Sequence, residues 1–207
     1  MNLFEWLSEH PDLSSQFNQS MTGVFGREPV LAAEAYDFSV FGSIIDVGGN
    51  NGNALSLIFD RHPGPTGLVF DQPHVINEAR SLIAERGLSD RIAASSGDFF
   101  KSIPAGFDCY MLSHIIHDWD DSRSIQILKN CREGINPKGK LLILEWVLPD
   151  GDTPHVAKVV DINMMMLTGG EERTGGQYGR LLAKAGFRLA RVIPTESECS
   201  IIEAEPV

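Results

Sequence analysis

The chain has 207 residues, a length that fits one α/β domain with a short helical arm. With 43% hydrophobic and 22% charged residues it can form a full core, which excludes global disorder. Its net charge of −11 argues against nucleic-acid or membrane partners, because such a surface repels phosphate groups.

The pattern of cysteines and apolar residues indicates the cellular compartment in which the protein is found. Cys109, Cys131 and Cys199 form no CxxC pair, which favours a reducing environment over a disulfide framework. The first six residues lack the basic region of a signal peptide, and no apolar run approaches the roughly 20 residues that span a bilayer. We therefore expect a cytoplasmic protein.

Residues 1–41 differ in pattern from the rest of the chain. Apolar side chains recur there at helical spacing, and Pro11 and Pro29 interrupt them, which predicts two or three short helices. These helices are too few to form a core alone. We predict that residues 1–41 are a helical arm packed on a domain of residues 42–207.

From Ser43 onward, strand patterns alternate with helical patterns. The predicted elements are strand 43–47, helix 54–61, strand 67–71, helix 75–85, strands 91–95 and 107–113, a helix from 120 or 121 to about 132, strand 140–147, helices 157–167 and 174–185, and strands 187–193 and 200–204. Thr174 and Gln177 resemble a capping box. The alternation indicates an α/β fold, with a mostly parallel, Rossmann-like sheet covered by helices on both faces.

A glycine-rich loop, Asp46-Val47-Gly48-Gly49-Asn50-Asn51-Gly52, follows the first predicted strand. Glycines at such a turn let the backbone approach a ligand closely. The loop lacks the GxGxxG dinucleotide pattern and the lysine of a Walker loop. A tight turn without a ligand is the alternative.

Acidic residues follow the next two strands. Asp71 ends the second strand, where an acid can accept hydrogen bonds from ribose hydroxyls. Asp98 follows the third strand, where it could accept from the adenine amine while Phe99 lies against the ring; a solvated loop residue or a cap is the alternative. Because the glycine loop contains no lysine or arginine, an adenosine ligand without a pyrophosphate fits best. S-adenosylmethionine, with its cationic sulfonium, therefore fits better than NAD or ATP.

Five segments carry a family resemblance: 46–52, 70–76, 97–100, 117–121 and 170–174. In this order they resemble the S-adenosylmethionine-dependent O-methyltransferases of the caffeic-acid and acetylserotonin type, over roughly residues 13–204. The resemblance implies the seven-stranded sheet of class I methyltransferases, with an antiparallel last strand. It also implies that the chain is the catalytic domain only, without the amino-terminal domain through which members form homodimers.

The resemblance further implies a set of residues that bind S-adenosylmethionine, with S-adenosylhomocysteine as the product. The set comprises Asp46, Gly48, Gly49, Asn50, Gly52, Asp71, Gln72, Asp98, Phe99, Ser113 and Trp119. Two positions depart from the family. Ser113 stands where a lysine is common, and Asn50 stands at a glycine position, although asparagine tolerates left-handed geometry.

Methyl transfer to oxygen requires alignment of the acceptor and removal of a proton. His117 follows an apolar strand, so it should lie at the carboxyl end of the sheet, and a neutral imidazole with a pKa of about 6.5 can accept that proton. His114 is a competitor, and a histidine that merely caps a helix is the alternative. The family's HDW motif selects His117 as the general base.

Two glutamates match the family's acids beside the base. Glu145 ends the most apolar strand, where a carboxylate without a partner is costly. Glu172 precedes Arg173, and a solvated loop residue is its alternative. We expect one or both to orient His117 and to stabilise its imidazolium form.

The remaining predictions concern the acceptor and metals. Met21, Phe25, Asp161, Asn163 and Met164 are predicted to contact a small, planar, hydroxylated aromatic acceptor of phenolic or polyketide type, as in secondary metabolism. The acidic residues at 118, 120 and 121 are interpreted as a helix start, so no metal is expected.

The predicted activity is therefore S-adenosylmethionine-dependent O-methyl transfer. The alternative is a truncated cofactor-binding module or a partner-dependent subunit with little activity of its own. An NAD-dependent oxidoreductase is disfavoured by the glycine loop.

Overall fold

The computed structural model describes residues 3–207. Its sheet has seven strands in the order β3-β2-β1-β4-β5-β8-β7, and an eighth strand, β6, pairs with β5. The strands are β1 (Ser43–Val47), β2 (Thr66–Asp71), β3 (Ile92–Ser96), β4 (Cys109–Ser113), β5 (Lys140–Leu148), β6 (Arg173–Thr174), β7 (Phe187–Pro194) and β8 (Cys199–Pro206). The predicted α/β fold is confirmed, and among the strands of the described residues only the two-residue β6 was not predicted.

Strands β3, β2, β1, β4 and β5 are parallel, while β8 is antiparallel to both of its neighbours. The chain moves outward from β1 to β2 and β3, and then returns to place β4 on the other side of β1. Ligands of open α/β sheets bind at the carboxyl ends of the strands beside such a reversal. The topology therefore directs attention to the ends of β1, β2 and β4.

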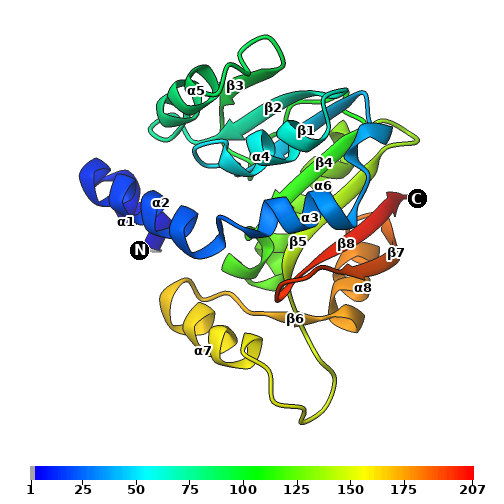
Figure 1. Cartoon of the computed structure of the whole chain (residues 1–207). Helices are drawn as coiled ribbons and strands as arrows, with labels where there is room; N and C mark the ends of the chain where they lie inside the picture. Colours follow the sequence, from blue (N-terminus) through cyan, green and yellow to red (C-terminus); the bar gives the residue numbers. More distant parts are fainter. Residues whose placement is uncertain (1–2) are drawn as a thin grey trace.

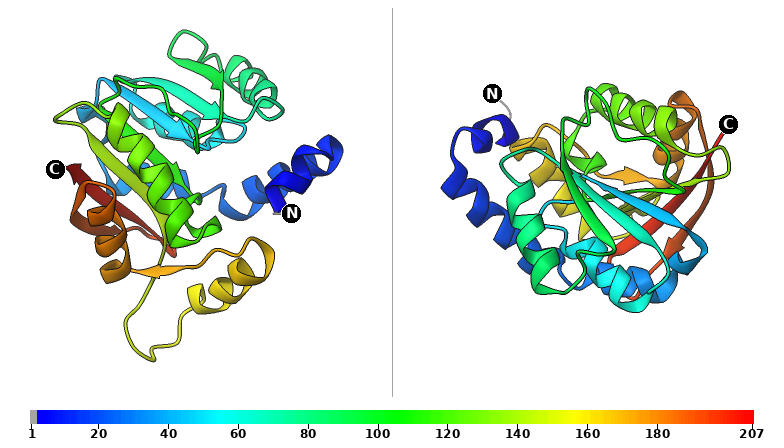
Figure 2. Two further views of the ribbon diagram at one scale, coloured as in Figure 1. Left: turned by 180° about the vertical axis from the view of Figure 1, so that it is seen from behind. Right: turned by 90° about the horizontal axis from the view of Figure 1, so that it is seen from above.

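Helices cover both faces of the sheet, as Figures 1 and 2 show. They are α1 (Leu3–Ser8), α2 (Pro11–Phe25), α3 (Glu28–Ala35), α4 (Asn53–Arg61), α5 (Ile76–Glu85), α6 (Asp121–Gly134), α7 (Ala157–Leu167) and α8 (Gly175–Lys184). Strand side chains alternate between the two faces, so Ile44 packs in the cluster beneath α3, α4 and α5, whereas Ile45 packs beneath α6 and α8. Both residues are fully buried, which explains why two adjacent positions of β1 are apolar.

The predicted arm, residues 1–41, divides into two parts. Its residues 1 and 2 lie outside the described residues. Helix α3 packs against α4 and buries Ala32 and Ala33 in the core. Helices α1 and α2 extend past the edge of the sheet, and α7 lies on the same side of the molecule (Figure 1). Among the described residues, no helix combines the length and the apolar character needed to cross a membrane.

Candidate active site

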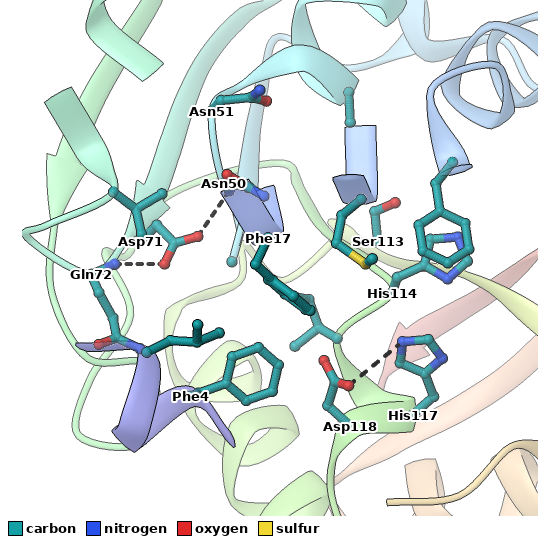
Figure 3. Close-up of a pocket in the computed structure, with 18 of the residues that line it drawn as sticks. Phe4, Phe17, Asn50, Asn51, Asp71, Gln72, Ser113, His114, His117 and Asp118 are labelled. Carbon is teal, nitrogen blue, oxygen red and sulfur yellow. Dashed lines mark hydrogen bonds and ion pairs between the residues drawn. The ribbon is translucent and has the colours of Figure 1, made fainter. Parts of the chain in front are cut away.

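A cavity of about 310 Å³ opens at the carboxyl ends of β1, β2 and β4, within the size range of small-molecule sites. Asp71 and His117 both line it, although Asp71 ends β2 and His117 follows β4, two strands on opposite sides of β1. Figure 3 shows Asp71 on one side of the cavity and His114 and His117 on the other. Helices α1, α2 and α7 contribute apolar side chains to its walls.

The glycine loop forms the wall beside β1. Asp71 ties this loop to the end of β2, because its carboxylate accepts from the backbone N–H groups of Asn50 at 2.8 Å and Gln72 at 2.6 Å (Figure 3). Asn50 has φ +51°, the left-handed geometry that its side chain tolerates. Gly48 and Gly49 also line the cavity. Gly52 does not line it, and instead begins α4 with φ +76°.

Asp46 lies at the base of the same wall and is completely buried. Neither of its carboxylate oxygens has a hydrogen-bond partner in the described part of the chain. Burial, and then the negative charge of Asp71, raise the pKa of Asp46 to about 7. A buried carboxylate without a partner is costly, so a cationic ligand in the cavity would be strongly favoured beside it.

Aromatic side chains from the segments after β3 and β4 form another part of the wall. Phe99 and Trp119 both line the cavity, with their ring centroids 6.2 Å apart in an edge-to-face arrangement. Asp98 does not line it. The carboxylate of Asp98 caps its own loop, accepting from the Phe100 N–H at 2.9 Å and pairing with Lys101 at 3.3 Å. For Asp98 the geometry therefore matches the capping alternative rather than the predicted adenine contact.

His117 lies in the short 3-10 helix η2 (Ile116–Asp118) and is 5% exposed. Its Nδ1 donates a hydrogen bond to Oε1 of Glu172 at 2.8 Å. Glu145 acts on the same turn, because its Oε1 accepts from the backbone N–H groups of residues 115, 116 and 117. The other oxygen of Glu145 lies 3.6 Å from Nδ1 of His117. Both glutamates are buried, so the solvated alternative for Glu172 does not hold.

The charges of the neighbouring carboxylates set the basicity of His117. Burial lowers the pKa of the imidazole, but the carboxylates of Glu145, Asp118 and Glu172 outweigh burial and raise it to about 10. The ordinary value of about 6.5 assumed from the sequence is therefore wrong. Burial also raises the pKa of Glu172, in spite of its imidazole partner. The neighbouring acids make His117 an unusually strong base.

Asp118 was misinterpreted from the sequence. Asp120 caps α6 by accepting from the N–H of Arg123 at 2.8 Å, and Asp121 lies in the first turn, as predicted. Asp118, however, precedes the helix, lines the cavity and lies 3.9 Å from Nε2 of His117 (Figure 3). Burial raises the pKa of Asp118 to about 7.

A buried arginine supports residues 116–119, called here the histidine turn. Its role was not predicted from the sequence. Arg173 is 1% exposed and donates to the carbonyl oxygens of Ile116 at 3.2 Å and Trp119 at 3.0 Å. Gly170 lies against the same turn, where a Cβ atom would fall 1.9 Å from the carbonyl oxygen of His117. The position of Arg173 beside Glu172 was a usable signal, whereas the role of Gly170 depends on tertiary contact alone.

The residues predicted to contact the acceptor have mixed positions. Met21, Phe25 and Met164 line the cavity, as does Ser113 from the predicted cofactor set. Asp161 instead accepts from the backbone N–H of Glu172 at 2.8 Å, so it supports the acid beside His117. Asn163 is exposed and does not line the cavity.

The described lining contains Asp46, Asp71 and Asp118 but no lysine or arginine. Such a cavity suits a cationic ligand and disfavours one that carries phosphate groups. His117, Glu145 and Glu172 also offer three ligand atoms within 4.8 Å of one another. Their mutual and backbone hydrogen bonds give this grouping a structural reason without a metal.

Comparisons with known proteins agree with this architecture. The model of the O-methyltransferase domain family matches residues 1–188. Phenazine O-methyltransferase PhzM from Lysobacter antibioticus is 45% identical over 99% of this chain and 60% of its own length. O-demethylpuromycin-O-methyltransferase from Streptomyces alboniger is 37% identical over 100% of this chain and 57% of its own.

Solved structures give the same result. The crystal structure of LaPhzM superposes with a TM-score of 0.97 at 44% identity, covering 100% of this chain and 62% of that one. Human N-acetylserotonin methyltransferase, solved with S-adenosylmethionine, gives a TM-score of 0.90 at 30% identity, covering 99% of this chain and 59% of that one. The chain thus spans about three fifths of the length of these relatives. On the sequence match and the shared fold together, it belongs to the O-methyltransferase domain family.

Proposed function

We propose that the protein transfers a methyl group from S-adenosylmethionine to a hydroxyl group of a small aromatic acceptor. One observation carries the proposal: a single cavity joins an acidic wall, whose described residues include no lysine or arginine, to the buried His117–Glu172 pair. The first feature suits the sulfonium donor, and the second suits removal of a proton from the acceptor.

The residues present fit the donor. Asp46 offers to a cationic group a buried carboxylate that has no hydrogen-bond partner among the described residues, and the backbone of Gly48 and Gly49 allows close approach. Asp71 already accepts two backbone hydrogen bonds, and a carboxylate has further lone pairs for ribose hydroxyls. Phe99 and Trp119 would flank the adenine. When bound, S-adenosylmethionine supplies an activated methyl group on a cationic sulfur.

His117 would act as the general base. A phenol has a pKa of about 10, so transfer of its proton to an ordinary imidazole would be uphill by about 5 kcal/mol. Since the acids around His117 raise its pKa to about 10, the transfer becomes nearly balanced. Glu172 would hold Nδ1, leaving Nε2 for the acceptor, and Glu145 would hold the turn.

The acceptor would be flat and largely apolar. Met21, Phe25 and Met164 supply adaptable apolar walls next to the histidine turn. Related proteins support an aromatic acceptor: NcsB1 from neocarzinostatin biosynthesis, 32% identical to this chain, was solved with 2-hydroxy-5-methyl naphthoic acid. We also propose that the protein forms a homodimer and acts in secondary metabolism.

The decisive test separates binding from transfer. Calorimetry should detect S-adenosylmethionine and S-adenosylhomocysteine binding to both the wild type and His117→Gln, while a phenol panel followed by mass spectrometry should give product with the wild type. The variant should lose about 100-fold or more in turnover. Binding without transfer by the wild type would favour the cofactor-binding module, and equal turnover of both proteins would reject His117 as the base.

A further inference from the structure

A second histidine–glutamate pair lies beside the first. His114, in the loop after β4, lines the cavity, and its Nε2 lies 2.5 Å from Oε2 of Glu28 at the start of α3. The ring centroids of His114 and His117 are 5.2 Å apart. The proton transfer described above uses neither His114 nor Glu28.

The partners of Glu28 fix the orientation of the second imidazole. Oε1 of Glu28 accepts from Nε1 of Trp146 at 2.7 Å, so both of its carboxylate oxygens act as acceptors. The Nε2 of His114 is therefore the donor nitrogen of the ring. In the neutral ring, Nδ1 is then the acceptor, because the partner of one imidazole nitrogen sets the state of the other.

The Nδ1 atom of His114 has no hydrogen-bond partner in the described part of the chain, although it is buried. Buried polar atoms are nearly always paired, and an exception calls for a water molecule or a ligand. The backbone adds a second signal, since His114 has φ +53°. Non-glycine residues rarely adopt this conformation, and those that do are concentrated at functional sites.

Phe25 of α2 packs against one face of the His114 imidazole. Its ring stacks on that of His114 with centroids 4.0 Å apart, and it meets Trp146 edge-on at 6.1 Å. Stacking covers a face of the imidazole, whereas a hydrogen bond to Nδ1 lies in the plane of the ring. The stacked ring of Phe25 therefore does not occupy the in-plane direction along which a partner would meet Nδ1.

We infer that His114 is a specificity-determining residue, whose Nδ1 accepts a hydrogen bond from a donor group next to the methylated oxygen. The preferred acceptor carries a second hydroxyl or an amino group adjacent to the reacting hydroxyl. His117 takes the reacting hydroxyl, and Nδ1 of His114 accepts from the neighbouring group. This inference rests on the proposed function and deepens it by naming the chemistry of the acceptor.

Two substitutions test the roles of the two ring nitrogens of His114 separately. In His114→Gln the amide nitrogen can replace Nε2 as the donor to Glu28, and the Nδ1 acceptor is lost. In His114→Asn a side-chain oxygen remains near the Nδ1 position, and the donor to Glu28 is lost. His62→Gln is the control for replacing a partly buried histidine, because the Nε2 of His62 bonds the carbonyl of Ala33 and the residue does not line the cavity.

The readout is a ratio of dissociation constants, measured by calorimetry with and without S-adenosylhomocysteine. The ligands are a naphthol without a second group and naphthols with an ortho hydroxyl, ortho amino or ortho methoxy group. For the wild type and His62→Gln, the ortho hydroxyl and ortho amino compounds should bind about tenfold more tightly than the other two. His114→Gln should bring all four within about twofold, and His114→Asn should keep part of the preference.

Two results would overturn the inference: an equal preference in the wild type and His114→Gln, or a methoxy compound that binds as tightly as the hydroxyl compound. Failure of the proposed function looks different. It appears as absent binding of S-adenosylhomocysteine and absent methylated product, while the ratios among the naphthols are still measured on the unloaded protein.

Discussion

His117 and Glu172 form a buried pair, joined by a hydrogen bond of 2.8 Å between Nδ1 and Oε1. The two residues are 55 positions apart in the chain, and they meet because the segment before β6 packs against the turn after β4. The pair fixes the orientation of the imidazole and leaves Nε2 as its other nitrogen. This orientation and the acidic wall opposite determine how the protein should respond to substitution and to pH.

Replacing Glu172 by glutamine should weaken the base while preserving the site. Glutamine keeps an oxygen for Nδ1 but removes a negative charge, so the pKa of His117 should fall. We expect the rising limb of turnover to move to lower pH and the plateau reached at high pH to drop by about 10- to 100-fold, since one pKa unit of lost basicity corresponds to about 1.4 kcal/mol. Steady-state kinetics with a phenolic acceptor measures this loss.

Glu171→Gln is the matched control for that variant. Glu171 is adjacent but half exposed, and it pairs with Arg173 rather than with His117. Turnover should stay within about twofold of the wild type, and both variants should bind S-adenosylhomocysteine normally. An equal loss of turnover in the two variants would contradict the role of Glu172.

The rate should depend on pH in the alkaline range. The pKa of His117 is raised to about 10, so in the free protein the imidazole holds its proton at neutral pH and loses it as pH rises. The value of kcat/KM should therefore climb with pH from 7 toward about 10, rather than level off above the ordinary histidine value. In Glu145→Gln, one raising charge is lost and the rising limb should move to lower pH. A plateau that begins near pH 7 in the wild type would contradict the raised pKa.

Binding of S-adenosylmethionine should strengthen through neutral pH. The pKa of Asp46 is raised to about 7, so below this pH its carboxyl group is largely protonated and offers no charge to a cation. Affinity should rise as pH increases from 6 to 8, with release of a proton on binding. Calorimetry in buffers of different ionisation enthalpy measures both quantities.

Asp46→Asn isolates this effect from the titration of the ligand itself. The variant should bind about 10- to 100-fold more weakly at pH 8, and the proton release that the wild type shows should disappear. Identical proton release in the two proteins would assign the titration to another group.

Gly170→Ala should disturb the histidine turn from outside the cavity. The added Cβ would lie 1.9 Å from the carbonyl oxygen of His117, so the backbone of one segment must move. We expect a loss of roughly 1–3 kcal/mol in the free energy of unfolding and a lower turnover. In the control Gly176→Ala, the nearest atom is 3.7 Å away in helix α8, so stability should be equal or higher and turnover unchanged.

The sequence determined the elements of the sheet and the residues around the glycine loop. Periodicity and glycine positions are local, so the strand at 43–47 and the capping box of Thr174 and Gln177 are formed as predicted. The parallel order also follows from the alternation of strands with helices. His117 and Asp71 were placed at one edge because both follow strands of such a sheet.

Only the tertiary structure shows which of the acidic residues face the cavity. Asp98 and Asp118 both follow strands or turns near the cavity, yet only Asp118 lines it, because Asp98 is held by its own loop and by Lys101. The basicity of His117 likewise depends on acids from β5, the turn after β4 and the segment before β6. A pKa is set by burial and by charges close in space, and no local pattern contains those distances.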